Sequence, residues 1–149
     1  MRALVGTGLL LGLAAACATI ASAQATGKRL TVAAYRAQAN AICSNERGET
    51  MSAYTHSATL PEYFDTEVPI VGKALASLKK LKPPVQLASL HARILTTVTN
   101  EFELFTLFQQ EVKAGVLTTA QWQQDPQPRQ LADQELALWR KVGTKVCGR

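Results

Sequence analysis

Residues 84–115 have the sequence PVQLASLHARILTTVTNEFELFTLFQQEVKAG and carry the clearest structural signal in the chain. Apolar side chains recur there every three or four residues, at Leu87, Leu90, Ile94, Val98, Phe102, Phe105, Phe108 and Val112. Three more leucines, Leu95, Leu104 and Leu107, widen this stripe. A stripe this wide predicts an amphipathic helix over about 85–114 that packs against two neighbours. Gly115 is expected to end it.

A first helix is predicted over 31–57, where Thr31 is a favourable N-cap. Its buried stripe is expected at helical spacing, at Val32, Tyr35, Ala39, Ile42 and Cys43. Alanines fill the first half of this segment and favour a helix, whereas Gly48 weakens its middle.

A second helix is predicted over about 60–81. Thr59 and Glu62 have the spacing of a capping box, in which each side chain bonds a backbone amide near the helix start. Pro69 lies inside the segment, so it either kinks the helix or delays its start to about Thr66.

A fourth helix is predicted over about 128–146, after a proline-containing connection at 116–128. Its inward side chains are expected to be Leu131, Leu138, Trp139, Val142 and Val146. Four helices joined by short breaks predict an all-α, antiparallel up-down four-helix bundle, in which the first and last helices are neighbours. The bundle is expected to form a single domain over 31–149, preceded by a short polar lead-in at 24–30.

The first 23 residues have the pattern of a secretory signal peptide. Arg2 supplies the positive start, an uncharged apolar stretch follows, and Ala21-Ser22-Ala23 is a cleavage signal, so the mature chain is expected to begin at Gln24. The protein is therefore predicted to be exported, to the periplasm or the extracellular space. An uncleaved membrane anchor and lipid attachment at Cys17, which would tether the protein to a membrane, remain as alternatives.

Loss of Cys17 with the signal peptide would leave one cysteine pair, Cys43 and Cys147. Exported chains form disulfides that persist, so a Cys43–Cys147 bond joining the first and last helices is predicted. Two free thiols, or a thiol nucleophile, are the alternative.

Composition and motifs exclude several classes of function. The formal net charge is +5, but the basic residues are scattered along the sequence and not interleaved with aromatic ones, which argues against nucleic-acid binding. The sequence has no HExxH or Glu-x-x-His metal motif, no CxxCH haem motif and no GxSxG elbow. We therefore predict no catalytic residue, no metal site and no cofactor.

The remaining ionisable residues receive structural interpretations. His91 is expected to be half-buried or exposed, and Glu46 to form a salt bridge with Arg36 or Arg140. Glu101 and Glu103 are two residues apart and should point to different faces of their helix. The acidic residues Glu62, Asp65 and Glu67 are interpreted as favourable charges near a helix N-terminus.

Three segments in this order are familiar: ANAIC at 39–43, LKPP at 81–84 and VGTKVC at 142–147. In these the chain resembles small exported or lipid-anchored helical proteins of bacteria that have no assigned function. The resemblance implies a helical bundle with a cysteine–cysteine staple and supplies no catalytic residues.

Together these features predict a non-enzymatic binding or interaction protein of the cell envelope, with a protein or an envelope surface as its partner. The alternative is a carrier of a small apolar ligand, held in the bundle core near Phe102, Phe105 and Trp139. A hydrolase would have only scattered carboxylates to act with.

Overall fold

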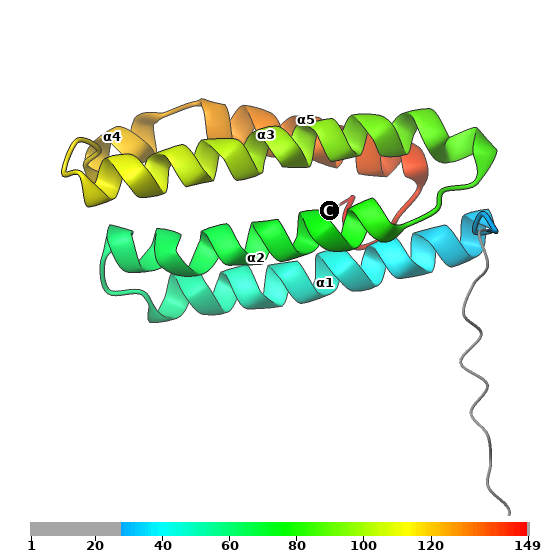
Figure 1. The fold of residues 1–149 in the computed structure, drawn as a ribbon, viewed down its shortest axis with the longest axis horizontal. Helices are drawn as coiled ribbons and strands as arrows, with labels where there is room; N and C mark the ends of the chain where they lie inside the picture. The colour runs from blue at the N-terminus through cyan, green and yellow to red at the C-terminus, as the bar shows by residue number, and fades with distance from the viewer. Residues whose placement is uncertain (1–27, 149) are drawn as a thin grey trace, which may run out of the picture.

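The computed structural model describes residues 28–148, and all regular structure in this range is helical (Figure 1). The four main helices are α1 (Val32–His56), α2 (Leu60–Lys80), α3 (Ala88–Lys113) and α5 (Gln127–Val142). Two short elements join them, the 3-10 turn η1 (Val85–Leu87) before α3 and α4 (Thr119–Gln124) after it. The predicted all-α class with four packed helices is confirmed.

The four helices lie along the long axis of the molecule, and consecutive ones run in opposite directions (Figure 1). Helix α2 packs closely against α1 and α3, and α3 packs against α5. The backbones of α1 and α5, by contrast, come close at few points. After α5 the chain turns back toward α1, so this C-terminal segment, residues 143–148, bridges the two helices (Figure 1).

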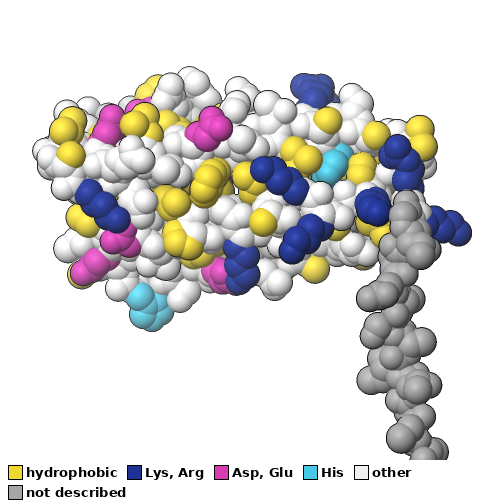
Figure 2. Space-filling model, in the orientation of Figure 1, with side chains coloured by type: hydrophobic (Ala, Val, Ile, Leu, Met, Phe, Trp, Pro, Cys, Tyr) yellow, Lys and Arg dark blue, Asp and Glu magenta, His cyan; other side chains and the backbone are white. Residues whose placement is uncertain are grey.

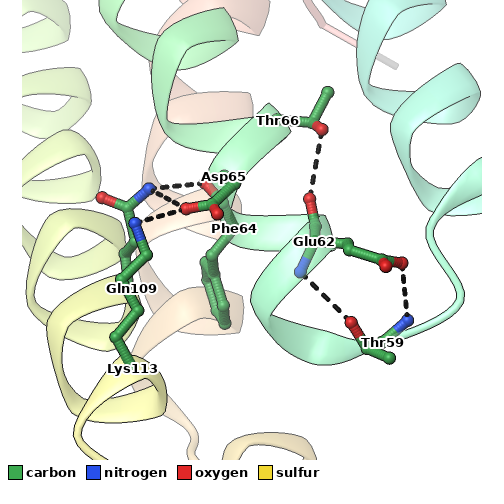
Figure 3. Close-up of polar contacts among 7 residues, drawn as sticks. All are labelled: Thr59, Glu62, Phe64, Asp65, Thr66, Gln109 and Lys113. Atoms are coloured by element: carbon green, nitrogen blue, oxygen red, sulfur yellow. Dashed lines mark hydrogen bonds and ion pairs between the residues drawn. The ribbon is translucent and has the colours of Figure 1, made fainter.

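Helices α1 and α2 begin at the capping residues predicted from the sequence. Thr31 accepts a hydrogen bond from the Ala34 amide at 3.1 Å, and Thr59 with Glu62 forms the complete capping box (Figure 3). Pro69 therefore lies within α2, and the alternative in which it delays the helix start to Thr66 is wrong.

Polar contacts also join α2 to α3 near the start of α2 (Figure 3). Asp65 forms an ion pair with Lys113 at 2.6 Å, and the Gln109 amide donates to Asp65 at 2.8 Å. Asp65 thus acts across helices, beyond the helix-dipole role that the sequence indicated. Both charged side chains are half exposed, so this pair adds little to stability.

Aromatic side chains fill the core. The ring of Phe64 lies edge-on, 5.9 Å between centroids, to both Phe105 and Phe108. Tyr35 and Trp139 are almost completely buried. Offset and edge-on contacts of this kind add to the stabilisation from burial alone.

The last helix is shorter than the sequence predicted. Helix α5 ends at Val142 because Gly143 adopts the left-handed conformation, with φ of 79°. Two effects disfavour a side chain at this position. The left-handed backbone conformation is one, and the other is that a Cβ would lie 2.9 Å from the Arg36 guanidinium. Val146 consequently lies outside the helix, although it remains half-buried.

The predicted Cys43–Cys147 disulfide is present, with the two Cα atoms 5.3 Å apart. Its neighbourhood reinforces the link, because Asn40 Oδ1 accepts hydrogen bonds from the amides of Lys145 at 3.1 Å and Val146 at 2.8 Å. Arg36 adds a bond of 2.7 Å to the Val142 carbonyl. The C-terminal segment is therefore fastened to α1 by covalent and polar contacts together.

The predicted signal peptide, its cleavage before Gln24 and the alternative lipid attachment at Cys17 lie outside the described residues. Within 28–148, none of the helices combines the length and the apolar character that a membrane span requires.

Reduction of the disulfide is expected to lower the free energy of unfolding by about 2–5 kcal/mol, because the bond closes a loop with a sequence separation of 104. Urea unfolding of oxidised protein, reduced protein and the Cys43→Ser/Cys147→Ser variant would measure this. The reduced protein and the double variant should agree. Equal stability of all three forms would show that the polar contacts alone fasten the segment.

Candidate functional site

Four glutamates, one from each main helix, line a single cleft of about 330 Å³. They are Glu46 on α1, Glu67 on α2, Glu101 on α3 and Glu135 on α5. We call this the glutamate cleft. Its other lining residues are Cys43, Arg47, Thr50, Val71, Ala132, Asp133, Leu136 and Cys147. The disulfide thus lies in the wall of the same cleft.

Each of these glutamates occupies a position in an otherwise apolar stripe. Glu46 follows buried Cys43 by three residues, Glu67 follows buried Phe64 by three, and Glu101 follows buried Val98 by three. Glu135 precedes buried Leu138 by the same interval. Residues three apart share a helix face, so all four acids point toward the bundle interior. A glutamate at an inward position of each of the four helices can be read from the sequence. It was not recognised there as the sign of a shared site.

Glu67 is the most deeply buried of the four, with only 3 % of its surface exposed. The Thr50 hydroxyl donates to Glu67 Oε1 at 3.0 Å. Glu67 Oε2 has no hydrogen-bond partner among the described residues. Burial raises the pKa of this carboxyl, against the opposing effect of the Thr50 hydrogen bond. A buried polar atom without a partner costs about 1–3 kcal/mol, so something must offset this loss.

Glu101 and Glu135 interact directly across the α3–α5 interface. Glu101 acts as the proton-bearing partner and donates a hydrogen bond to the Glu135 carboxylate, which also accepts from Trp139 Nε1 at 2.6 Å. Burial, followed by the charges of Glu135 and its neighbours, raises the pKa of Glu101 to about 8. Burial also raises the pKa of Glu135. The pair therefore shares a proton at neutral pH.

Glu46 does not form the expected salt bridge with Arg36 or Arg140. Arg36 donates instead to the Val142 carbonyl, and Arg140 Nε donates to the Gly148 carbonyl at 3.2 Å. Burial, followed by the charges of Glu135 and Glu67, raises the pKa of Glu46 to about 8, and only Arg47 acts in the opposite direction. The expected salt bridge is absent because both arginines donate instead to backbone carbonyl groups, of Val142 and Gly148.

Glu103 and Glu62 behave as the sequence indicated, whereas Glu67 does not. Glu103 is exposed while Glu101 faces the cleft, so the two do point to different sides of α3. Glu62 completes the capping box of α2. Glu67 is the exception, because burial in the cleft, and not the helix dipole, determines its environment.

His91 is buried, with 6 % of its surface exposed, which corrects the expectation of a half-buried or surface position. The Tyr35 hydroxyl lies 2.9 Å from His91 Nδ1, and the two rings meet edge-on. Burial lowers the pKa of His91 and raises that of Tyr35 to about 12, so both side chains are neutral at pH 7. This pair is a satisfied polar contact within the core.

Of the three side chains that were expected to line an apolar pocket, Phe105 and Trp139 fill the core, and Phe102 is partly buried against it. Trp139 is 1 % exposed and Phe105 8 %, and both belong to the central hydrophobic cluster. A different cleft, of about 790 Å³, lies at the end of the bundle that carries the α1–α2 turn. Its aromatic lining consists of Tyr54, Tyr63 and Trp122, and we call it the aromatic cleft.

Across residues 28–148, no three His, Cys, Asp or Glu side chains converge in an arrangement that could hold a metal ion. The four glutamates share a cleft without meeting at one point.

Surface charge is segregated on the face drawn in Figure 2. Acidic side chains lie mostly on the half that carries the α1–α2 turn, and basic side chains lie mostly on the other half. On this face the basic residues are thus less scattered than they are along the sequence.

In comparisons with known proteins the chain matches no family model, no curated protein and no solved structure. The resemblance to small exported helical proteins of bacteria therefore stays a prediction, of which the helical fold and the disulfide are confirmed.

The raised pKa of Glu101 predicts stability that falls with rising pH. In the folded protein Glu101 keeps its proton up to about pH 8. In the unfolded chain it has the ordinary pKa of 4.5 and releases the proton above that pH. The contribution of Glu101 to the free energy of unfolding should therefore be largest below pH 4.5. It should fall by about 1.4 kcal/mol per pH unit between pH 4.5 and pH 8.

Glu101→Gln should flatten this fall, since the amide stays neutral and can still donate to Glu135. Urea unfolding at pH 5, 6, 7 and 8 would measure it, with Glu103→Gln on the exposed side of α3 as the matched control. Equal pH slopes for wild type and Glu101→Gln would contradict a shared proton at this site.

Proposed function

We propose that this protein is an exported, non-enzymatic binding protein of the cell envelope, and that the glutamate cleft is where it binds a positively charged group. The observation that carries the proposal is Glu67, which lines the cleft together with three more glutamates and whose buried Oε2 has no hydrogen-bond partner among residues 28–148. A bound cation would supply the missing partner and would favour the charged form of every carboxyl around it.

The charge distribution supports this choice of ligand. The chain as a whole carries a formal net charge of +5, yet the cleft lining contains five acidic residues and one arginine. An acidic cleft attracts cations locally even in a protein whose net charge is positive. Placement of one acid on each of four helices also fits the way bundles build ligand sites from facing side chains.

The envelope location draws support from the disulfide, since such bonds form and persist in oxidising compartments. It also draws on the predicted signal peptide at residues 1–23.

Hydrolysis is less well supported than binding, although the structure gathers carboxylates that the sequence had scattered. A glycoside hydrolase of the usual kind places two carboxyl groups about 5 Å or more apart, on either side of the bond that it breaks. Glu101 and Glu135 are hydrogen bonded to each other, so their carboxyl groups lie closer together than this arrangement requires.

The proposal is tested by thermal unfolding at pH 8 with chloride salts of divalent metals, 1,4-diaminobutane and arginine, each matched in ionic strength to potassium chloride. At least one cation, at 100 times its Kd, should raise the Tm of wild type by about 5 °C or more. Glu67→Gln should abolish the increase, and Glu103→Gln should keep it. A Tm that no cation changes, or an increase that survives in Glu67→Gln, would contradict the proposal.

The aromatic cleft favours a second candidate, a carrier of a small apolar ligand. Three aromatic rings and Leu60, Val112 and Leu117 line it, and rings of this kind present apolar faces to a ligand. The carrier would act here and not beside Phe105 and Trp139, which fill the core.

A carrier should retain an apolar molecule after purification, and mass spectrometry of an organic extract would detect it. Trp122→Ala is expected to lower the amount bound several-fold, because Trp122 is only half-buried and lines the cleft. Glu103→Gln, outside the lining, is the control. Extracts without any apolar molecule would remove this candidate.

A further inference from the structure

We propose that the glutamate cleft binds a small aliphatic diamine or polyamine, with one ammonium group bridging Glu101 and Glu135 in place of their shared proton and a second at Glu67, whose Oε2 has no hydrogen-bond partner among residues 28–148. This inference rests on the proposed function, because it names the class of cation that the cleft takes. The geometry, lining and charge of the cleft each point to this class.

The charge of the cleft lining favours a ligand with more than one positive charge. Glu46, Glu67, Glu101, Asp133 and Glu135 line it, and Arg47 is the one basic residue in its lining. Arg47 also donates to the Val146 carbonyl at 3.3 Å, so part of its hydrogen-bonding capacity is directed toward the C-terminal segment. A ligand with a single charge would leave most of these carboxylates without a counter-charge in a partly desolvated site.

The spacing of the acids favours amines over a metal ion. Calcium and magnesium require several oxygen ligands that converge within about 2.0–2.6 Å of one point. Residues 28–148 offer no such convergence. Ammonium groups bond carboxylate oxygens at about 2.7–3.2 Å, and two of them on one chain can reach carboxylates that lie apart.

The size of the cleft also exceeds the needs of a single ion. Its volume of about 330 Å³ corresponds to about ten water molecules at roughly 30 Å³ each. Between the acids, Val71, Ala132, Leu136 and the Cys43–Cys147 disulfide give the lining an apolar part. A methylene chain between two ammonium groups can pack against this wall, so the ligand and the lining match in both charge and apolar surface.

Binding should displace protons. The hydrogen that Glu101 shares with Glu135 must leave for solvent when an ammonium group takes its place. The ionisable groups around that pair are Glu46 and Arg47 from α1, Tyr63 and Glu67 from α2, and Asp133 from α5. Because Glu46 and Glu101 have pKa values of about 8, the affinity should rise with pH up to that value.

Calorimetric titration of the full, disulfide-bonded chain at pH 8 with 1,4-diaminobutane, spermidine, butylamine and manganese chloride tests the inference. At least one of the two polyvalent amines should bind about tenfold or more tighter than butylamine, because each charged hydrogen bond contributes at least that factor. Its affinity should fall about tenfold per pH unit between pH 8 and pH 6 for each displaced proton. Repetition in buffers of different ionisation enthalpy should register the released protons directly.

Glu67→Gln should weaken the binding of that amine about tenfold or more, whereas Glu103→Gln should leave it unchanged. Glutamine matches the shape of a protonated glutamate, and urea unfolding would verify that both variants fold.

Equal affinities for the polyvalent amines and butylamine would overturn the inference, as would full affinity in Glu67→Gln. Manganese binding without amine binding would overturn the inference and leave the proposed function standing. Absence of binding by every probe here, together with a Tm that no cation changes, would overturn both.

Discussion

The link between the C-terminal segment and α1 is the constraint on which the rest of the structure depends. Helices α1 and α5 come close at few points, so direct packing of one on the other does not close that side of the bundle. The Cys43–Cys147 bond closes it, supported by Asn40, whose Oδ1 accepts hydrogen bonds from the segment, and by Arg36, which donates to the Val142 carbonyl. The same segment then forms part of the wall of the glutamate cleft, because Cys43 and Cys147 both line it. The staple therefore has a role in shaping a site as well as in limiting the unfolded chain.

The four inward glutamates make the bundle less stable than an apolar core would. Burial raises the pKa of all four carboxyl groups, and for Glu46 and Glu101 the charges of neighbouring carboxylates raise it further. Apolar side chains of similar size would avoid both costs. Sequences depart from such packing rules mainly at functional sites, and four departures that meet in one cleft are difficult to explain by stability alone. The energetic cost of these glutamates is therefore consistent with the binding role that we propose for the cleft.

Local chemistry explains the elements that the sequence analysis predicted well. Thr31, Thr59 and Glu62 act within a single turn, so their capping roles depend only on neighbouring residues. The stripe from Leu87 to Val112 predicted α3 for the same reason, although its first turn is the 3-10 element η1. The end of α5 was misplaced, because apolar spacing continues to Val146 while the left-handed Gly143 stops the helix at Val142. Burial of His91 was missed because the Tyr35 hydroxyl that satisfies it lies on another helix.

By itself the sequence determined the four helices, the face that each one buries and the single cysteine pair predicted for the mature chain. These follow from helical periodicity, capping and the small number of cysteines, all of which act along the chain. Only the tertiary structure decided that Glu46, Glu67, Glu101 and Glu135 lie at the same level of the bundle and line one cleft. Periodicity fixes the face on which a residue lies. The relative shift of neighbouring helices along their axes is decided by how side chains such as Phe64, Phe105 and Trp139 pack across the core.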